Sequence, residues 1–377
     1  MKLQQEVWTA NGTTSVGLVE DVADADLVLG FGAPQLLADS DIWKRLRAKW
    51  SRASIVACST AGEISGTQVL DDTLALTAIR FERTRTRCVR VLLSPGLSSA
   101  DAGRQLAEQL QAPDLRHVFV LSDGLKVNGS ELVAGMTAAL PAHVSLTGGL
   151  SGDGARFERT YVCVDQFDER PCVAAVGFYG DALKVSFASL GGWDTFGPER
   201  RVTRSKDNVL YELDGQPALD LYEQYLGEHA AALPASGLSF PLSVRMSREQ
   251  TAVVRTILAV DHQARSLTFA GDVPTGAYAR LMRANFERLV EGAEGAARTC
   301  NGEAENRPDL AILISCVGRK LVLKQRIEEE VEAVSQVLGA GVPLTGFYSY
   351  GEISPFTPSA RCELHNQTMT ITTLSEA

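Results

Sequence analysis

Short apolar runs alternate along the chain with amphipathic stretches and polar turns. The apolar "ADLVLGFG" is followed by "LLADSDIWKRLRAKW", in which apolar residues recur at helical spacing, and then by a second apolar run, "SIVACS". Short apolar runs bounded by turns are typical of buried strands, and three-to-four spacing is typical of a helix packed on a sheet. The pattern therefore predicts strand–helix–strand units, which usually build parallel strand pairs with helices on the sheet faces.

The order of these elements repeats within the chain. Residues 73–110 and 251–289 each predict a strand, a polar turn, a second strand and a helix. Both are followed by a strand, a loop with glycine and a cation, a helix, a strand and a glycine–carboxylate turn. We interpret this as an internal duplication. The predicted fold is α/β, with two related α/β domains that have mixed sheets and flanking helices.

The length of 377 residues exceeds one ordinary core, which also favours two domains. The first is enlarged by an N-terminal strand–helix–strand segment. No low-complexity linker separates the halves, so we expect them to pack on each other. We place the boundary near residue 212, giving domains of residues 1–212 and 213–377.

Glycine followed by a carboxylate closes three of the apolar runs, as "AGEI", "SGDG" and "YGEI". Ligands of open α/β sheets favour the carboxyl ends of strands, where these loops would lie. We therefore expect Glu63, Asp153 and Glu352 to line one pocket. A carboxylate in a glycine turn can equally accept backbone N–H bonds and pin the turn, so a purely structural role stays open for each acid.

Cations follow two other strands, Lys126 in "SDGLK" and Arg319 in "SCVGRK". Each lies near a predicted helix start, where free N–H groups favour an anion. Acids on one wall and cations on another would suit a small zwitterion such as an amino acid, with Tyr350 as a ligand wall. On this hypothesis Arg319→Ala weakens ligand binding without unfolding the protein. Neighbours in the same motifs complete the candidate set: Cys58, Thr60, Gly62, Gly149, Cys316 and Gly351.

The composition excludes several other partners. The net charge is -10 and the basic residues are scattered, which disfavours nucleic acid and anionic membranes. No apolar stretch is long enough for a signal peptide or a membrane span, and no C-x-x-C pair occurs among the seven cysteines. We expect a cytoplasmic protein with reduced, buried thiols and no membrane insertion.

The sequence lacks a recognisable catalytic pattern. "GFYSYG" and "GLSGDG" both fail the G-x-S-x-G elbow, and neither a phosphate-binding G-x-x-x-x-G-K-[ST] loop nor an H-E-x-x-H pair is present. We therefore predict a protein that is not an enzyme. An enzyme that uses Cys58 or the clustered carboxylates is kept as an alternative.

Several motifs in order resemble the signature segments of FIST-domain proteins: "ACSTAGEISG", "TGGLSGDG", "SCVGR", "LTGFYSYGEISP" and "ELHNQT". The similarity runs from about Ala25 to Thr372. It implies FIST N-terminal and C-terminal domains and a bacterial sensory protein of signal transduction. Such a protein would bind a small, amino-acid-like ligand and relay the signal to a separate histidine kinase or cyclic-dinucleotide enzyme. Whether the chain forms a homodimer is left open.

Stand-alone members of the family include haem-containing nitric-oxide sensors that control a histidine kinase. The resemblance therefore also implies an alternative, a haem-based gas sensor in a two-component system. The cofactor is unknown on sequence grounds, but haem is compatible with the family. Among the five histidines, His365 in the strand after the last glycine–carboxylate loop is our candidate axial ligand.

Overall fold

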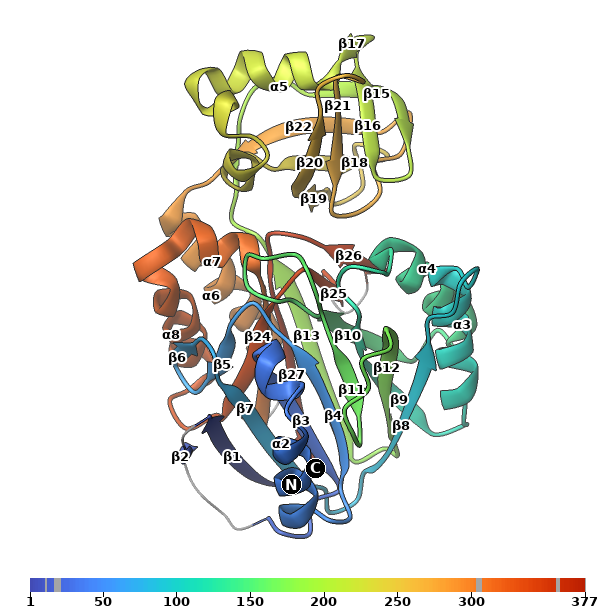
Figure 1. The fold of residues 1–377 in the computed structure, drawn as a ribbon, viewed down its shortest axis with the longest axis vertical. Coiled ribbons are helices and arrows are strands. Elements are labelled where there is room, and N and C mark those ends of the chain that lie inside the picture. Colours follow the sequence, from blue (N-terminus) through green and yellow to red (C-terminus); the bar gives the residue numbers. More distant parts are fainter. Residues whose placement is uncertain (11, 17–21, 303–306, 357–359, 377) are drawn as a thin grey trace.

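The computed structural model describes residues 1–10, 12–16, 22–302, 307–356 and 360–376. Its helices and strands form a main body of three six-stranded sheets, with a smaller domain above it (Figure 1). The α/β class with mixed sheets and flanking helices is confirmed. A repeated unit occurs three times in the body, but it is not the repeat expected between residues 73–110 and 251–289, because residues 251–283 belong to the smaller domain.

Each unit supplies an edge strand, two parallel strands joined through a helix, and a final antiparallel strand. The first unit pairs its parallel strands over six positions, from Leu27–Ser54 to Gly32–Ser59. Its elements are β1 (Lys2–Thr9), β2 (Gly12–Val16), β3 (Leu27–Gly32), α1 (Pro34–Leu37), α2 (Ser40–Lys49), β4 (Ser54–Ser59), β5 (Glu63–Ser65), β6 (Gln68–Leu70) and β7 (Leu74–Arg80).

The second unit repeats this order and adds one helix after its edge strand. Asn128 accepts bonds from the N–H groups of Ser130 and Glu131 and so begins the crossover helix α4. The elements are β8 (Arg85–Leu92), α3 (Ser99–Leu110), β9 (Leu115–Ser122), α4 (Gly129–Ala139), β10 (Ser145–Leu150), β11 (Val162–Val164) and β12 (Cys172–Tyr179).

The third unit is interrupted after its edge strand by the smaller domain. Its helix α6 buries Leu289, Ala293, Ala296 and Cys300, a spacing of three and four that turns one face to the core. The elements are β13 (Leu183–Leu190), α6 (Phe286–Gly302), β23 (Leu310–Cys316), α7 (Val317–Leu323), a short turn of helix (Lys324–Arg326), α8 (Ile327–Leu338), β24 (Leu344–Ser349), β25 (Gly351–Pro355), β26 (Cys362–His365) and β27 (Met369–Glu376).

The three units exchange strands in a cycle. The strand after each second parallel strand leaves its own sheet, so β5 joins β24, β11 joins β4 and β25 joins β10. The sheet orders are β11-β4-β3-β7-β1-β2, β26-β25-β10-β9-β12-β8 and β13-β27-β23-β24-β5-β6. Because every glycine–carboxylate turn sits at such a crossing, the exchange brings all three turns to the junction of the sheets.

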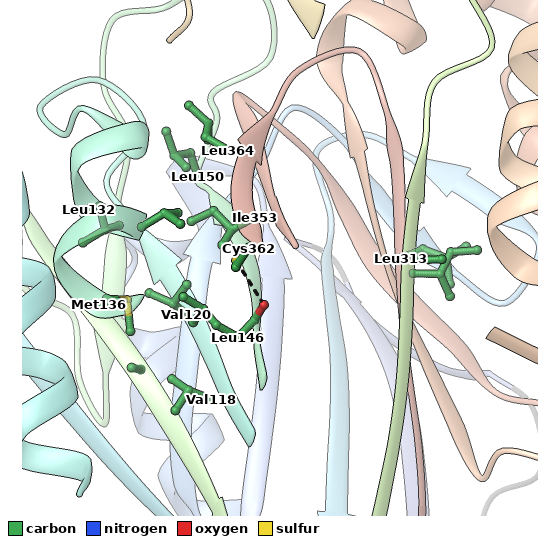
Figure 2. Packing of buried hydrophobic residues seen from close by; sticks show 14 of the residues in the cluster. Val118, Val120, Leu132, Met136, Leu146, Leu150, Leu313, Ile353, Cys362 and Leu364 are labelled. Atoms are coloured by element: carbon green, nitrogen blue, oxygen red, sulfur yellow. Dashed lines mark hydrogen bonds between the residues drawn. The ribbon is translucent and has the colours of Figure 1, made fainter. Parts of the chain in front are cut away.

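The inner faces of the three sheets share one apolar core. It includes Phe31, Cys58, Phe119 and Phe347 from different units, and the rings of Phe31 and Phe347 stack with centroids 4.8 Å apart. The outer faces pack against helices. In Figure 2, Leu132 and Met136 of α4 lie against the strands that carry Val120 and Leu146. The hairpin of β25 and β26, which the third unit contributes to this sheet, joins the layer. The thiol of Cys362 on β26 contacts the Leu146 carbonyl.

Residues 193–283 form the smaller domain, which we call the upper domain. It is an antiparallel sheet with one helix and two short 3₁₀ segments on its own core, which includes Leu210, Tyr222 and Phe269. The elements are β14 (Asp194–Thr195), β15 (Arg200–Lys206), β16 (Val209–Leu213), β17 (Gln216–Pro217), α5 (Ala218–Leu226), η1 (Gly227–Ala232), η2 (Ala235–Ser239), β18 (Leu242–Arg245), β19 (Val253–Arg255), β20 (Ile257–Asp261), β21 (Ser266–Phe269) and β22 (Tyr278–Arg283).

The boundary that we place near residue 212 falls inside β16. As a division between sequence domains it stays a prediction. In space the chain divides differently, because β15, before this boundary, and β16, which contains it, pair with later strands of the upper domain, while β23 to β27 return to the body. In the described part of the chain, we find no helix that combines the length and the apolarity needed to cross a membrane.

Candidate functional site

The three glycine–carboxylate loops meet one another through backbone hydrogen bonds. Ala61 N–H donates to the Tyr348 carbonyl at 2.8 Å, Gly152 N–H to the Ser59 carbonyl at 2.9 Å, and Tyr350 N–H to the Leu150 carbonyl at 3.1 Å. Each loop therefore binds a neighbour from another unit, which closes a ring. The convergence anticipated from the repeated motif is present in the structure.

Two of the three acids, Glu63 and Glu352, form their hydrogen bonds within this ring of loops and the strands that follow it. Glu63 accepts bonds from the hydroxyls of Thr60 and Thr73 and from the Thr73 N–H at 3.1 Å. Glu352 repeats the arrangement with the Ser349 hydroxyl and with the N–H and hydroxyl of Thr368. Both side chains are buried, and burial raises the pKa of Glu63 to about 7 and that of Glu352 to about 8.

This geometry gives Glu63 and Glu352 a structural role at the strand crossings. Thr73 and Thr368 each precede the last strand of a unit, β7 and β27, so the carboxylates fix the start of those strands. Neither acid is among the residues that line the four cavities described for this chain. Glu63 and Glu352 could therefore contact a ligand only if their loops changed conformation.

Asp153 differs, because it organises a segment that reaches a cavity. Its carboxylate accepts the N–H groups of Phe157, Glu158 and Arg159 at 2.8–2.9 Å and the hydroxyl of Tyr350. Burial favours the neutral acid, but these donors outweigh it, so the pKa of Asp153 lies below its ordinary value. The Phe157 ring is thereby stacked on Tyr350, with centroids 4.4 Å apart.

Phe157 carries backbone strain that its surroundings maintain. Its φ is 55°, a region that bulky residues rarely occupy, and its side chain is 41% exposed. The Asp153 carboxylate and the stack on Tyr350 hold it there. Strained residues that the surrounding structure holds in place cluster at binding sites, which makes this aromatic pair a feature of functional interest.

The aromatic pair forms one wall of a cavity of about 700 Å³ between the body and the upper domain. Body residues line it from the loop after β9, the start of α7 and the loop near Phe157, and upper-domain residues close it. The lining residues are 124–129, Leu150, Ala155, Phe157, Asn208, Pro234, Ala235, Leu238, 256–258, 269–271, Cys316, Val317, Leu321, Tyr350 and Leu364. Most of these side chains are apolar, as is usual for small-molecule sites.

Polar contacts bridge the two parts beside this cavity. The Asn128 amide donates to Asp272 at 3.0 Å, and Arg255 donates to the Leu364 carbonyl at 2.9 Å. Arg255 is buried, which lowers its pKa to about 10. Thr256, also buried and among the lining residues, has a hydroxyl with no hydrogen-bond partner within the described chain. A bound polar group would supply the missing partner.

The predicted site residues divide into two groups. Lys126, Cys316 and Tyr350 line the cavity. The others belong to the ring of loops or to the core, and none of them is among the lining residues: Cys58, Thr60, Gly62, Glu63, Gly149, Asp153, Arg319, Gly351 and Glu352. Sequence reasoning missed Phe157, Asn128, Thr256 and the upper-domain wall; a lone aromatic in the polar "GARFERT" was the available signal for Phe157.

Arg319 lies below the cavity rather than in its wall. The side chain has no exposed surface, donates to Glu330 at 2.7 and 2.9 Å, and binds the carbonyls of Gly191 and Leu289. The Gly191 carbonyl lies in the segment that leads from β13 into the upper domain, and the Leu289 carbonyl lies in the first turn of α6, after the chain has returned to the body. Arg319 therefore ties α7 to the entry of the upper domain and to the start of α6, and its role in ligand binding stays a prediction.

Cys58 and His365, the residues of the two alternative roles, are both fully buried. Cys58 is fully buried in the central core, and burial raises the pKa of its thiol, the opposite of an activated nucleophile. His365 is fully buried too, its ring bonds the Ser354 carbonyl through Nε2, and burial lowers its pKa to about 4. Its Nδ1 has no hydrogen-bond partner among the described residues, and His365 is not among the residues that line the four cavities described for this chain. Its role as a haem axial ligand stays a prediction.

Comparison with known proteins gives two family matches. The FIST N domain model matches residues 26–216, and the FIST C domain model matches residues 218–355. The uncharacterised protein MJ1623 of Methanocaldococcus jannaschii is 23% identical over 307 residues, which are 74% of this chain and 57% of that protein. The chain thus spans little more than half the length of this relative.

Solved structures add a weak likeness. A cyanuric acid hydrolase from A. caulinodans covers 78% of this chain and 99% of its own, with 11% identity and a TM-score of 0.19. A TM-score this low carries no inference about fold or activity.

Proposed function

The chain belongs to the FIST family, whose domains are associated with sensory roles in signal transduction, and from this premise we propose that it is a sensor for a small organic ligand. The ligand binds in the cavity between the body and the upper domain. The signal passes to a separate partner, a histidine kinase or a cyclic-dinucleotide enzyme. The protein acts by binding and not by catalysis.

One observation carries this proposal: the cavity is built jointly by two parts of the chain. Its volume of about 700 Å³ lies within the range of small-molecule sites, and both the body and the upper domain contribute walls. A ligand held between two parts stabilises the arrangement in which both contact it. Binding can thereby change the position of the upper domain, which is the property a sensor needs.

Helix α7 supplies a physical route from the cavity to the rest of the molecule. Val317 and Leu321 line the cavity, while Arg319 of the same helix holds the Gly191 and Leu289 carbonyls. A further hydrogen bond joins the start of the upper domain to the body: the Trp193 indole donates to the Gln367 carbonyl at 2.8 Å. A ligand that displaces α7 would therefore act on the entry to the upper domain at Gly191 and on the start of α6, where the chain has just returned from that domain.

The proposal is tested by a thermal-shift screen in which a blocked cavity serves as the control. The screen covers apolar amino acids, small carboxylates and hemin, because a ligand that binds only the folded state raises the melting temperature. Ala235→Trp fills the cavity from η2, and Ala232→Trp places the same ring at an exposed position that does not line it. We expect hits that persist in Ala232→Trp and are lost in Ala235→Trp.

Hits that survive in Ala235→Trp would place the ligand elsewhere and overturn the proposed site. A screen in which hemin alone raises the melting temperature, together with a Soret band, would instead support the gas-sensor alternative.

A further inference from the structure

The cavity contains a single charged side chain among the described residues that line it, Lys126. Lys126 is exposed and forms no ion pair within the described part of the chain. Lys320, in contrast, binds Asp71 and the Ala61 carbonyl. The cavity therefore offers one uncompensated positive charge in a protein with a net charge of -10.

Three carboxylates bond residues that line this cavity, and each already has hydrogen-bond partners; Asp123 accepts the N–H groups of Leu125 and Lys126. Asp153 is saturated by three N–H groups and the Tyr350 hydroxyl, and Asp272 accepts from Asn128 without lining the cavity. No Asp or Glu is found among the described lining residues. A ligand ammonium group would therefore lose its hydration without gaining a carboxylate partner, which is unfavourable.

The remaining walls suit an apolar body. Phe157 and Leu258 are among the largest exposed apolar side chains, at 41% and 44%, and both line this cavity. Leu150, Phe269 and Leu321 add further apolar surface. Removing this surface from water favours a ligand with an aliphatic or aromatic portion.

We infer that the ligand is a small organic monoanion, a carboxylate on an apolar body, with its head group at Lys126 and its body between the Phe157–Tyr350 pair and the upper domain. This inference rests on the proposed sensory function and narrows its ligand class. It departs from the amino-acid-like ligand expected from the sequence, because the acidic wall needed for a zwitterion does not face the cavity.

The test uses four probes with one carbon skeleton and different heads: 3-phenylpropionate, L-phenylalanine, 3-phenylpropan-1-ol and 3-phenylpropylamine. Titration calorimetry on the full chain measures each dissociation constant, with octanoate as a second anionic body. We expect 3-phenylpropionate and octanoate to bind at least about tenfold more tightly than the alcohol, since a charge-assisted bond to lysine contributes about this factor. The amine should bind most weakly.

Substitutions of Lys126 then assign the head-group contact. Lys126→Met should weaken 3-phenylpropionate by about tenfold and leave the alcohol unchanged, whereas Lys126→Arg should retain most of the affinity. Lys184→Met removes an exposed lysine on β13 away from the cavity and should change neither. Melting temperatures of all variants establish that each is folded.

The outcomes separate this inference from the proposed function. Equal affinity for acid and alcohol, with both lost in Ala235→Trp, would leave the sensory cavity in place and overturn the anionic class. Tighter binding of L-phenylalanine than of 3-phenylpropionate would also overturn it and return the ligand to the amino acids. Failure of all five probes to bind at millimolar concentration would overturn it as well, while the wider thermal-shift screen continues to test the cavity.

Discussion

Arg319 and Glu330 form an ion pair in which neither side chain has exposed surface, with Nη2 of the arginine 2.7 Å from Oε2 of the glutamate. Glu330 also accepts the hydroxyls of Ser315 and Tyr348. The guanidinium in turn holds the carbonyls of Gly191 and Leu289. The pair thus joins α7 and α8 to the entry of the upper domain at Gly191 and to the first turn of α6, and it stabilises the junction on which the proposed relay depends.

Replacing this arginine should therefore destabilise the protein. Arg319→Ala leaves Glu330 buried without its partner, and we expect the free energy of unfolding to fall by about 3–5 kcal/mol. Urea denaturation measures this. Arg326→Ala, which removes more exposed pairs with Glu287 and Glu329, is the control and should cost at most about 1 kcal/mol. A loss below about 1 kcal/mol for Arg319→Ala would contradict the structural role and revive the sequence expectation that the substitution spares stability.

The buried carboxylate of Glu352 should make stability fall as the pH rises. Burial raises the pKa of Glu352 to about 8 from an ordinary value of 4.5, so the folded state holds a proton that the unfolded chain has released. The stabilisation is complete below about pH 4.5 and is lost as the pH rises through about 8. Glu63, with a pKa of about 7, acts in the same direction.

The wild type and Glu352→Gln are best compared between pH 6.5 and 8.5, where few other buried groups change their protonation. Buried His117 and His365, whose pKa values are lowered to about 3 and about 4, reduce stability mainly below this window. We expect the wild-type melting temperature to fall across it and the slope to be smaller in Glu352→Gln, which cannot ionise. Matching slopes for the two proteins would show that Glu352 does not titrate in this range.

Much of the fold follows from local sequence pattern. The apolar "LVLGFG" and "SIVACS" are strands of one parallel pair, and the amphipathic segment between them contains α2, because period and turn residues act over short distances. The exchange of β5, β11 and β25 between sheets was not predictable in this way. It depends on which neighbouring unit each strand meets, and no local pattern encodes that pairing.

The candidate site was harder to predict for a related reason. The convergence of Glu63, Asp153 and Glu352 could be inferred from repetition, but whether a carboxylate faces a ligand or a threonine cannot be inferred. Thr73 and Thr368 occupy equivalent places before β7 and β27. Their hydroxyls donate to Glu63 and Glu352 and so turn these carboxylates toward the protein. The upper-domain wall, including Thr256 and Leu258, becomes part of the site only through tertiary packing.

Phe157 should respond differently to glycine and to alanine. Glycine adopts φ near 55° without strain, so Phe157→Gly gains about 1 kcal/mol that offsets the loss of the Tyr350 stack, worth about 0.5–1.5 kcal/mol. Phe157→Ala loses the stack but keeps the strain. We expect the glycine variant to be more stable than the alanine variant by about 1 kcal/mol in urea denaturation, and both to bind 3-phenylpropionate less tightly than the wild type. Equal stabilities of the glycine and alanine variants would contradict the conclusion that the backbone of Phe157 is strained.

The hydroxyl of Tyr350 should control the order of the segment that carries Phe157. It donates to the Asp153 carboxylate, contacts the N–H groups of Asp153 and Phe157, and lies 3.1 Å from the Gly154 carbonyl. In Tyr350→Phe the ring can still stack, but the link between the two loops is lost. Hydrogen exchange should then speed up at the amides of residues 157–159.

Strand β23 supplies the internal reference for this measurement, because its amides lie in the centre of a sheet between β24 and β27. Their exchange should not change if the substitution acts only on the loop. A uniform acceleration over both regions would mean that Tyr350 stabilises the whole body. Unchanged exchange at 157–159 would mean that the Asp153 carboxylate orders the segment without help from the hydroxyl, and the aromatic wall would then depend on Asp153 alone.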